Sequence, residues 1–237
     1  MLFINVLLFY LAILRAEASP ALPYIATMFS QISQYLNNVH LSNCPLAKTN
    51  LPSHGSLPGP SPGLSLKYVT IGRGTQSYTC QDDSSTTVPK SVSAVATLVD
   101  VSCLAASNPT LLHNFTPVVK EVQSEALPFL AVLGSQLSSS ATKFILGKHQ
   151  FNAAGQPTFD LRLAGGSDWV ASKRAASSDA PDRSTVNVPW LKLTSVSGNG
   201  IKEVYRLHTV GGQPPANCQK RKGTFQVDYA AEYWFYG

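Results

Sequence analysis

The chain has 237 residues, a formal net charge of +5 at pH 7 and only 13% charged side chains. This length corresponds to one ordinary domain, or to one large β domain with extensions. The densest positive charge is Lys220-Arg221-Lys222, which falls far short of a nucleic-acid-binding surface. We therefore expect no nucleic-acid partner. We interpret this cluster as a solvated loop, with attraction to an anionic wall or matrix polymer as the alternative.

Residues 1–18 have the pattern of a secretory leader. Residues 2–14 are almost continuously apolar, with only Asn5 interrupting them, and Ala16-Glu17-Ala18 follows shortly after. A short apolar run before Ala-x-Ala predicts a signal peptide that is cut after Ala18. The run is shorter than the about 20 residues of a membrane-spanning helix, and no second run of that length follows. We expect a secreted protein, extracellular or in the cell wall, without a membrane anchor.

The next segment predicts a helix and then an arm. Residues 23–41 carry apolar side chains at spacings of three and four, which indicates an amphipathic helix that begins after Pro23. Such a helix packs on its domain by default, and a partner-facing or lipid-facing role is the alternative. Residues 43–63 are rich in Pro, Gly and Ser, which predicts a linker or a strapped-down arm.

Residues 66–80 give the clearest strand pattern, and Gly72-Arg73-Gly74 interrupts it. Glycine inside a strand indicates a bulge or a close approach of another backbone. A bulge here would expose Arg73 and Gln76 to a ligand. The alternative is a bulge that only bends a long strand around a small core. A dinucleotide-binding loop is excluded because no third glycine and no helix pattern follow.

The middle of the chain changes from strand to helix. Residues 88–104 predict a second strand whose two faces are both partly apolar, as in a buried strand. Residues 108–137 place apolar side chains at helical spacing, but Pro117 and Pro128 interrupt the pattern. We therefore predict one or two short helices. They could cap one end of the sheet like a lid, or pack against it without a gating role.

From residue 141 the pattern returns to strands separated by turn clusters. The predicted strands cover residues 143–151, 158–163, 169–175, 188–195, 201–209 and 224–236. Asn199-Gly200 lies between two of them and is a strong hairpin signal. Short strands at regular spacing are typical of a sandwich or a barrel.

Four cysteines follow the leader, which predicts two disulfides in an oxidising compartment. Three pairings are open. We favour Cys80–Cys103, since these cysteines end one predicted strand and follow the next, and this leaves Cys44–Cys218. A metal site is not expected, because the cysteines have neither CxxC spacing nor neighbouring histidines. The sequon Asn114-Phe115-Thr116 predicts a glycosylation site at Asn114.

Three blocks of sequence together resemble a family of secreted fungal and bacterial proteins classed as a domain of unknown function. The blocks are residues 72–80 (GRGTQSYTC), 188–193 (VPWLKL) and 210–215 (VGGQPP), the last leading to Cys218 and residues 229–236. The resemblance covers residues 66–236 and implies a secreted single domain without an established activity. Some members carry a malate dehydrogenase label, which this chain does not support because GxGxxG and βαβ alternation are both absent from its sequence. The segment from His149 to Asp160 departs from the family pattern, with Phe159 in place of a Trp.

Candidate catalytic residues come from the polar side chains of the later strands, which include Asp168 and Arg206. His149, Asp160 and His208 could form a hydrolase site or a metal triad, although they share no local motif. Asp160, Asp168 and Glu203 could supply a glycosidase pair of carboxylates. A structural role for each histidine is the alternative interpretation.

Aromatic residues indicate a different function. Trp169 and Trp190 on the later strands suit stacking on sugar rings, and burial in the core is the alternative. We predict an all-β sandwich or barrel, residues 64–237, with an N-terminal helix and arm in residues 19–63 and the helical insertion 108–137. The preferred function is a non-catalytic extracellular or cell-wall protein that binds wall polysaccharide. A secreted hydrolase acting on wall polysaccharide or ester, and a structural or host-interaction protein, are the alternatives. No cofactor is expected, and oligomeric state stays open.

Overall fold

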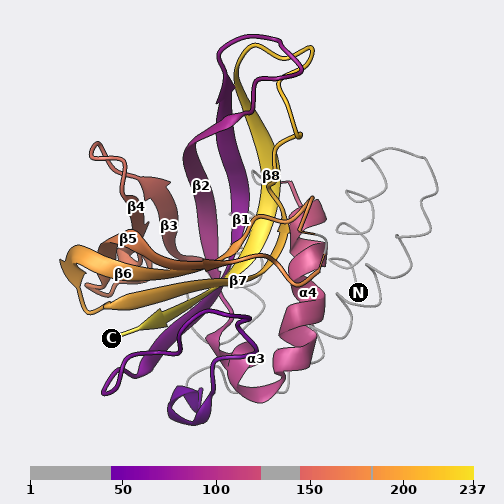
Figure 1. Ribbon diagram of the computed structural model, residues 1–237. Helices are drawn as coiled ribbons and strands as arrows, with labels where there is room; N and C mark the ends of the chain where they lie inside the picture. The colour runs from indigo at the N-terminus through magenta and orange to yellow at the C-terminus, as the bar shows by residue number, and fades with distance from the viewer. Residues whose placement is uncertain (1–43, 124–144, 183) are drawn as a thin grey trace, which may run out of the picture. The chain divides into compact units, whose positions relative to one another are not determined.

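The computed structural model describes residues 44–123, 145–182 and 184–237, and these form a closed barrel of eight antiparallel strands (Figure 1). The strands follow one another around the barrel in chain order, and β1 pairs with β8 to close it. They are β1 (Leu66–Cys80), β2 (Lys90–Asp100), β3 (Ile145–Phe151), β4 (Pro157–Asp160), β5 (Trp169–Ser178), β6 (Trp190–Asn199), β7 (Glu203–Gly211) and β8 (Gly223–Tyr236). The barrel alternative of the predicted fold class is therefore confirmed. The predicted leader and the helix at residues 23–41 lie outside the described residues.

Alternation along β8 separates the inside of the barrel from the outside. Tyr229, Ala231, Tyr233 and Phe235 belong to the interior core, so Glu232 and Trp234 face outward. Other strands add aliphatic and aromatic side chains to that core, among them Leu98, Phe159, Val170, Leu193 and Val204. The outward residues of β8 are nevertheless buried, because other segments cover this part of the wall.

Helices cover the wall formed by β7, β8 and β1. α3 (Ser102–Ser107) leads into α4 (Pro109–Glu121), which packs on these strands (Figure 1). The side chain of Asn108 caps α4 by accepting a hydrogen bond from the Leu111 amide at 3.0 Å. The prediction that Pro117 breaks the helix is wrong, since α4 continues through it to Glu121. The missing amide costs α4 one hydrogen bond near its end, and burial of Val118 and Val119 offsets that loss.

The predicted strapped-down arm lies on the outside of β6 and β7, after the short helix η1 (Leu46–Lys48). The Tyr205 hydroxyl donates to the Pro58 carbonyl at 2.9 Å, and Lys192 Nζ donates to the Gly59 carbonyl at 2.8 Å. Ser61 donates to Glu203 through both its amide and its hydroxyl, at 3.1 and 2.6 Å. Buried polar side chains of the wall thus find their partners on the arm, and this fixes its course.

The predicted bulge at Gly72-Arg73-Gly74 is wrong. All three residues stay in register with both β2 and β8, and the shifts of β1 lie elsewhere, near Ser77 and near its start. The glycines instead allow neighbouring groups of the barrel to approach β1 closely. A Cβ at Gly74 would overlap the backbone of Val95, and one at Gly72 would meet the Tyr233 ring.

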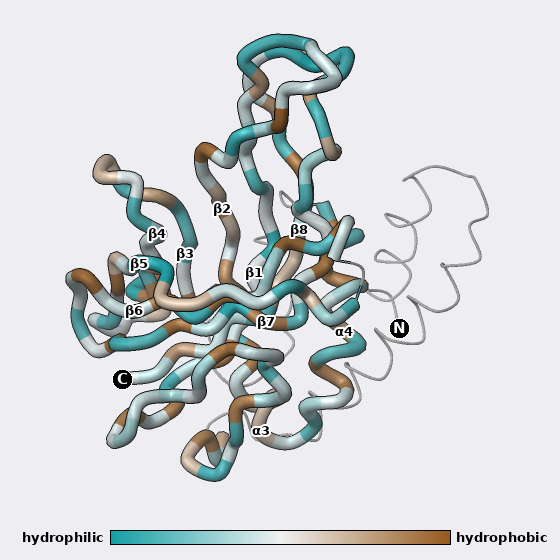
Figure 2. The backbone as a smooth tube through the Cα atoms, in the orientation of Figure 1, coloured by the Kyte–Doolittle hydropathy of each residue, from teal (hydrophilic) through white to brown (hydrophobic). Residues whose placement is uncertain are grey.

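The expectation that β2 is buried on both faces is also wrong. Val92 and Val95 are 52% and 46% exposed, whereas Ala94, Ala96 and Leu98 are buried. At one end of the barrel β1, β2 and β8 extend beyond the other strands (Figure 1), and the tip they form is mostly hydrophilic (Figure 2). The outer face of β2 there has no element packed on it among the described residues.

The favoured disulfide pairing is wrong, although all four cysteines are bonded. Cys44 pairs with Cys103, and Cys80 pairs with Cys218. The β1–β2 hairpin explains the difference, because Thr79 lies opposite Lys90 while Thr70 lies opposite Asp100. Cys80 and Cys103 therefore stand at opposite ends of β2, roughly 30 Å apart for a strand of this length.

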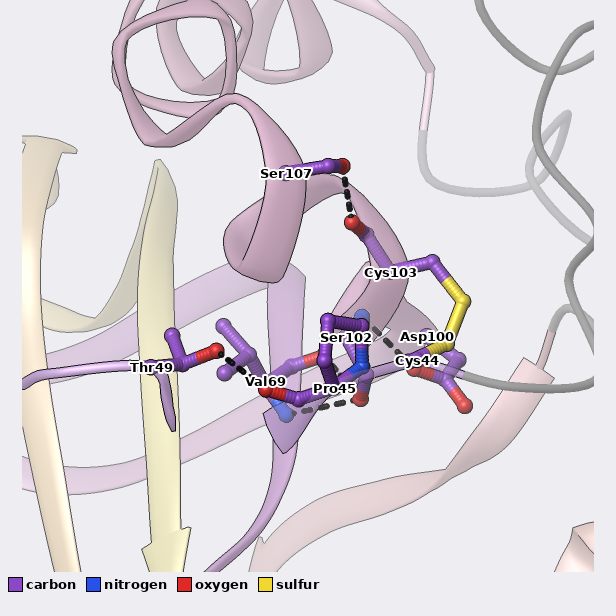
Figure 3. The surroundings of a disulfide bond; sticks show 8 residues. All are labelled: Cys44, Pro45, Thr49, Val69, Asp100, Ser102, Cys103 and Ser107. Carbon is purple, nitrogen blue, oxygen red and sulfur yellow. Dashed lines mark hydrogen bonds between the residues drawn. A yellow bond between two sulfur atoms is a disulfide. The ribbon is translucent and has the colours of Figure 1, made fainter. Parts of the chain in front are cut away.

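Each disulfide ties an irregular segment to regular structure. Cys44–Cys103 fastens the start of the arm to α3, close to where Ser102 Oγ accepts from the Val69 amide at 3.0 Å (Figure 3). Cys80–Cys218 joins the end of β1 to the loop before β8. Within the described segments, no helix is long and apolar enough to cross a membrane.

Candidate functional site

The structure does not bring together the three residues considered for hydrolysis. His149 lies inside the barrel, stacked on Phe159 with ring centroids 4.3 Å apart. Asp160 is the next residue after Phe159, so it faces outward, where it pairs with Arg162 at 2.7 Å. His208 lies on the outer wall, stacked against His113 of α4. The barrel wall separates His149 from the other two.

The acidic residues considered for glycosidase chemistry are each engaged with a cation. Lys67 pairs with Asp168 at 2.5 Å, and Lys192 pairs with Glu203 at 3.0 Å. Asp168 also accepts from the Tyr68 hydroxyl at 3.0 Å. These contacts hold the carboxylates of Asp168 and Glu203 in structural ion pairs.

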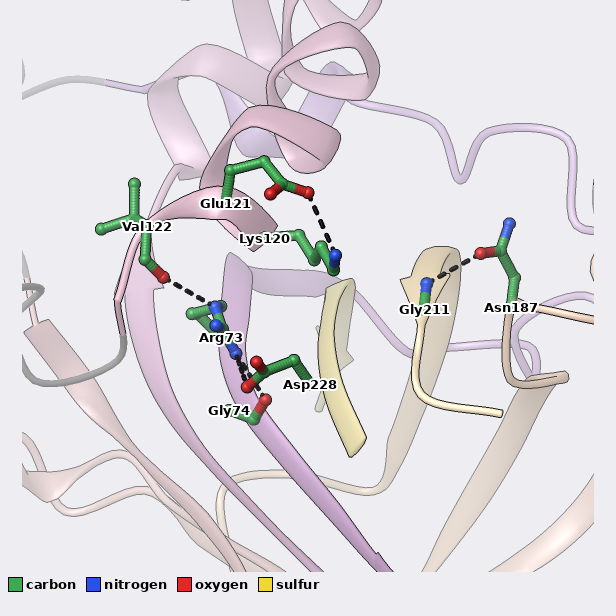
Figure 4. A network of polar contacts seen from close by, with 8 residues as sticks. All are labelled: Arg73, Gly74, Lys120, Glu121, Val122, Asn187, Gly211 and Asp228. Carbon is green, nitrogen blue, oxygen red and sulfur yellow. Dashed lines mark hydrogen bonds and ion pairs between the residues drawn. The ribbon is translucent and has the colours of Figure 1, made fainter. Parts of the chain in front are cut away.

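Arg73, a predicted ligand contact, is only 4% exposed. Its guanidinium donates to the Val122 carbonyl at 2.9 Å and to the carbonyl of the next residue, Gly74, at 2.7 Å. It also pairs with the carboxylate of Asp228 at 2.9 Å (Figure 4). It therefore fastens the residue after α4 to β1 and β8. Arg73 thus has a structural role. Figure 4 also shows Asn187, whose side-chain oxygen accepts a hydrogen bond from the Gly211 amide.

The predicted sugar-stacking aromatics do not form an exposed strip. Trp190 is 6% exposed and packs against His208 at 5.1 Å between ring centroids. Trp169 is partly exposed, with Arg162 over its ring at 5.9 Å. The exposed large hydrophobic side chains of the described residues are all aliphatic: Val88, Val92, Val95, Leu163, Val186 and Val196.

Polar side chains instead gather inside the barrel, and we call Gln76, His149, Arg206, Tyr229 and Tyr233 the interior polar cluster. The Tyr229 and Tyr233 hydroxyls are 2.9 Å apart. Gln76 interacts with Tyr229, and Arg206 with Tyr233 directly opposite it across β7 and β8. The ring of His149 lies 5.8 Å from that of Tyr233. Because the surrounding core is apolar, these few polar groups interact at low effective dielectric.

Hydrogen-bond donors outnumber acceptors in this cluster. Arg206 donates from Nε and Nη2 to the Pro189 carbonyl, at 3.2 and 2.8 Å. No carboxylate of the described residues pairs with its guanidinium. The buried Nε2 of Gln76 has no hydrogen-bond partner of good geometry, although it lies close enough to Tyr229 to act against the raised pKa of that phenol. A guanidinium and an amide with unused donors favour an acceptor with negative charge.

The protonation states follow from burial. Burial raises the pKa of Tyr233, and Arg206 acts in the opposite direction. Burial likewise raises the pKa of Tyr229, so both phenols are neutral near pH 7. Burial lowers the pKa of His149 to about 4, although the hydrogen bond from Nδ1 to the Thr158 carbonyl opposes this and nearby Arg206 adds to it. Arg206 is therefore the one cationic side chain of the interior polar cluster at neutral pH.

The shifted pKa of His149 predicts a loss of stability in acid. Below pH 6.5 the unfolded chain takes up a proton at this residue, whereas the folded chain does not until about pH 4. The free energy of unfolding should therefore fall as pH decreases through this window, by up to about 3 kcal/mol. We expect His149→Phe, which keeps an aromatic ring against Phe159, to remove this contribution.

Denaturant unfolding at pH 7.5, 6.0 and 4.5 tests the prediction. The difference in unfolding free energy between the native protein and His149→Phe should shrink or reverse toward pH 4.5. Parallel pH curves for the two proteins would contradict the assignment of a buried neutral imidazole.

A second group of titratable residues lies on the outer wall. His113, His208 and Glu232 offer one ligand atom each, and these atoms all lie within 4.8 Å of one another. Burial lowers the pKa of His208, while the carboxylate of Glu232 opposes this effect and His113 adds to it. Among the described residues this is the group of His, Cys, Asp and Glu side chains arranged to hold a metal ion.

Sequence reasoning found part of these sites. It named His149, Arg206 and His208, and it placed Gln76 at a ligand site. It missed His113 and did not select Glu232. Two signals could have identified them: His113 and Thr116 share one face of α4 at spacing i, i+3, and Glu232 is the lone charge in the apolar end of β8.

The described residues thus form a closed antiparallel barrel whose apolar core contains the interior polar cluster. The model of the family described as "Protein of unknown function (DUF3455)" matches residues 60–237. The chain belongs to this family, as the resemblance of the three sequence blocks implied. No curated protein matches the chain. No solved structure matches it either.

Proposed function

We propose that this is a secreted, non-catalytic binding protein that takes an anionic ligand at Arg206. The proposed ligand group is a carboxylate, and an acidic sugar of a wall or matrix polysaccharide is its proposed source. Two features support an extracellular location: the leader pattern of residues 1–18 and the presence of two disulfides. The separation of His149, Asp160 and His208 supports binding over hydrolysis.

The observation that carries the proposal is the unpaired guanidinium of Arg206. The Arg206 side chain is partly exposed, so a ligand can reach it from solvent. It faces Tyr233 inside the wall, and its hydrogen-bond acceptors among the described residues, the Pro189 carbonyl and the Tyr233 hydroxyl, are both neutral. Burying charge without a counter-ion is costly, so an incoming carboxylate gains more here than at an exposed arginine.

Neighbouring groups favour a ligand with hydroxyls beside its carboxylate. Gln76 offers an unused amide donor, and the paired hydroxyls of Tyr229 and Tyr233 can donate or accept. Tyr78 and Phe225 are cross-strand neighbours on the same face of β1 and β8, with ring centroids 5.8 Å apart. Tyr78 is buried, but the partly exposed ring of Phe225 suits the apolar face of a sugar.

Calorimetric titration with a matched pair of probes tests the proposal. The probes are galacturonate oligomers and galactose oligomers of equal length, which differ in the carboxylate. We expect the acidic probe to bind at least about tenfold more tightly, and Arg206→Gln to weaken it about 10- to 100-fold, as for a lost charge-assisted hydrogen bond. The release of new reducing ends should not exceed that of a blank.

Arg174→Gln is the matched control, because Arg174 is exposed on β5. It carries the same change of charge and should bind the acidic probe like the native protein. Equal affinity for both probes, equal effects of the two substitutions, or no binding at all would overturn the proposal. Release of reducing ends would overturn its non-catalytic part.

A further inference from the structure

The outer-wall group of His113, His208 and Glu232 has no role in the proposed ligand site. It lies between α4 and the outside of β7 and β8, whereas the interior polar cluster lies on the other face of the same wall. The two imidazole rings are stacked with centroids 3.8 Å apart and planes 15° apart. Nδ1 of His113 lies 2.8 Å from Oε1 of Glu232.

Glu232 is held in place from several sides. Its side chain is fully buried, although it occurs between Ala231 and Tyr233 on an apolar strand. Trp234 Nε1 donates to Oε2 at 3.1 Å, and Thr116 Oγ1 donates to Oε1 at 3.3 Å. A buried carboxylate normally needs a cation, and outer hydrogen bonds of this kind orient metal-binding carboxylates in proteins.

The backbone is arranged to place His208 in this group. Between Leu207 and Val210, β7 has an extra residue relative to β8, and His208 adopts a left-handed conformation with φ of 46°. A non-glycine residue in this conformation stores strain, and β-bulges often redirect a side chain beside a functional site. The bulge turns His208 outward to meet His113 and Glu232.

His208 also has an unused ring nitrogen. Its Nε2 is buried and has no hydrogen-bond partner, although Trp190 and His113 pack against the ring. A structural ion pair between His113 and Glu232 explains their close contact. It does not explain why a strained bulge brings a second imidazole to the same carboxylate and leaves its nitrogen unpaired.

We propose that His113, His208 and Glu232 bind one divalent transition-metal ion of the zinc class. Two imidazole nitrogens and one carboxylate oxygen form a donor set that suits such ions, whereas calcium and magnesium prefer oxygen ligands alone. The side chain of His113 is 25% exposed, so the ion can enter from the α4 side. Three protein ligands leave a coordination position for water or an external ligand.

Cobalt(II) is the probe for the experiment, because its visible absorption reports its coordination. The full secreted chain is stripped with a chelator and titrated with Co²⁺, and Zn²⁺ is then added in competition. We expect saturation at one equivalent, absorption bands that Zn²⁺ abolishes, and a higher unfolding temperature with Zn²⁺. His208→Gln and Glu232→Gln should each weaken binding about 100-fold or more.

His54→Gln is the matched control. His54 lies on the arm, where Nδ1 contacts the Pro52 carbonyl at 2.9 Å, and its loss should leave the Co²⁺ titration unchanged. Circular dichroism establishes that each variant is folded. If Glu232→Gln does not fold, His208→Gln and His113→Gln decide the question.

Absence of saturable Co²⁺ binding by the native protein would overturn the metal site. So would native affinity in His208→Gln, or an equal loss in His54→Gln. The probes for the Arg206 proposal are metal-free oligosaccharides, so the two experiments are independent. Failure of one proposal therefore does not decide the other.

Discussion

Replacing Gly74 with Ala should prevent the barrel from closing normally. Gly74 lies in the middle of β1, opposite Ala96 of β2 and Tyr229 of β8. A Cβ there would overlap the Val95 carbonyl and crowd the Cα of Ala96, and both are backbone atoms. Relief would require β1 and β2 to separate, so we expect a loss of about 4 kcal/mol or more in the free energy of unfolding, or no folded protein.

Gly166→Ala is the control for this substitution. Gly166 has nothing within 4 Å of its would-be Cβ, so the same methyl group should change stability by less than about 0.5 kcal/mol. Gly72→Ala should give an intermediate loss, since its Cβ would meet the side chains of Tyr233 and Leu98, which can move. Denaturant unfolding of the three variants tests the order. A Gly74→Ala protein as stable as Gly166→Ala would show that β1 and β2 are not this close.

The strands of the barrel were largely predictable because their signals are local. Alternation and turn residues place β3 to β8 within a few residues of their observed bounds. Closure could not be derived this way. It depends on β1 pairing with β8, for example Gly74 with Tyr229, across most of the chain, and local patterns carry no information about such contacts.

The errors share a physical cause, which is tertiary context. Glycines at 72 and 74 indicated a bulge or a close approach, and only the neighbouring strands decide between them. Pro117 breaks isolated helices, but packing on β7 and β8 supports α4 through it. Arg73 looked exposed because its partner Asp228 lies far along the chain.

The candidate sites were predictable as residue types but not as groups. His208 was an obvious candidate, yet its orientation depends on a bulge in β7 that has no sequence signature. Its neighbour His113 comes from a helix that crosses the outside of the barrel. Arg206 and Tyr233 meet because they are cross-strand partners on the interior face, which follows only once register is known.

Removing the Cys80–Cys218 disulfide should also cost several kcal/mol. The bond joins residues 138 positions apart, whereas Cys44–Cys103 joins residues 59 apart. In the chain-entropy account, such a loop contributes about 5 kcal/mol, and the difference between the two loops is only about 0.8 kcal/mol. Loop length alone therefore predicts similar losses for the two double Cys→Ala variants.

The two variants should differ in where the protein loosens. At the tip, the Cys218 amide donates to the Thr87 carbonyl at 2.7 Å, and Thr87 Oγ1 donates to Asp82 at 2.5 Å. The Thr87–Asp82 bond is exposed, and most residues of the two loops that meet at the tip are exposed as well, so the disulfide is the main tether of the tip. In Cys80→Ala/Cys218→Ala, amides of residues 81–89 and 213–222 should lose protection from hydrogen exchange, while those of β6 and β7 stay protected until global unfolding.

Cys44→Ala/Cys103→Ala provides the comparison, because its exchange should increase in the arm and α3 and leave the tip unchanged. If both variants lost protection uniformly, the disulfides would act only through the unfolded chain. The tip lies at the end of the barrel where Tyr78 donates to the Gly212 carbonyl at 2.7 Å, next to Gln76. Loosening the tip should therefore weaken binding of the acidic probe at Arg206. It should leave Co²⁺ binding intact, since α4 and the bulge of β7 keep their contacts.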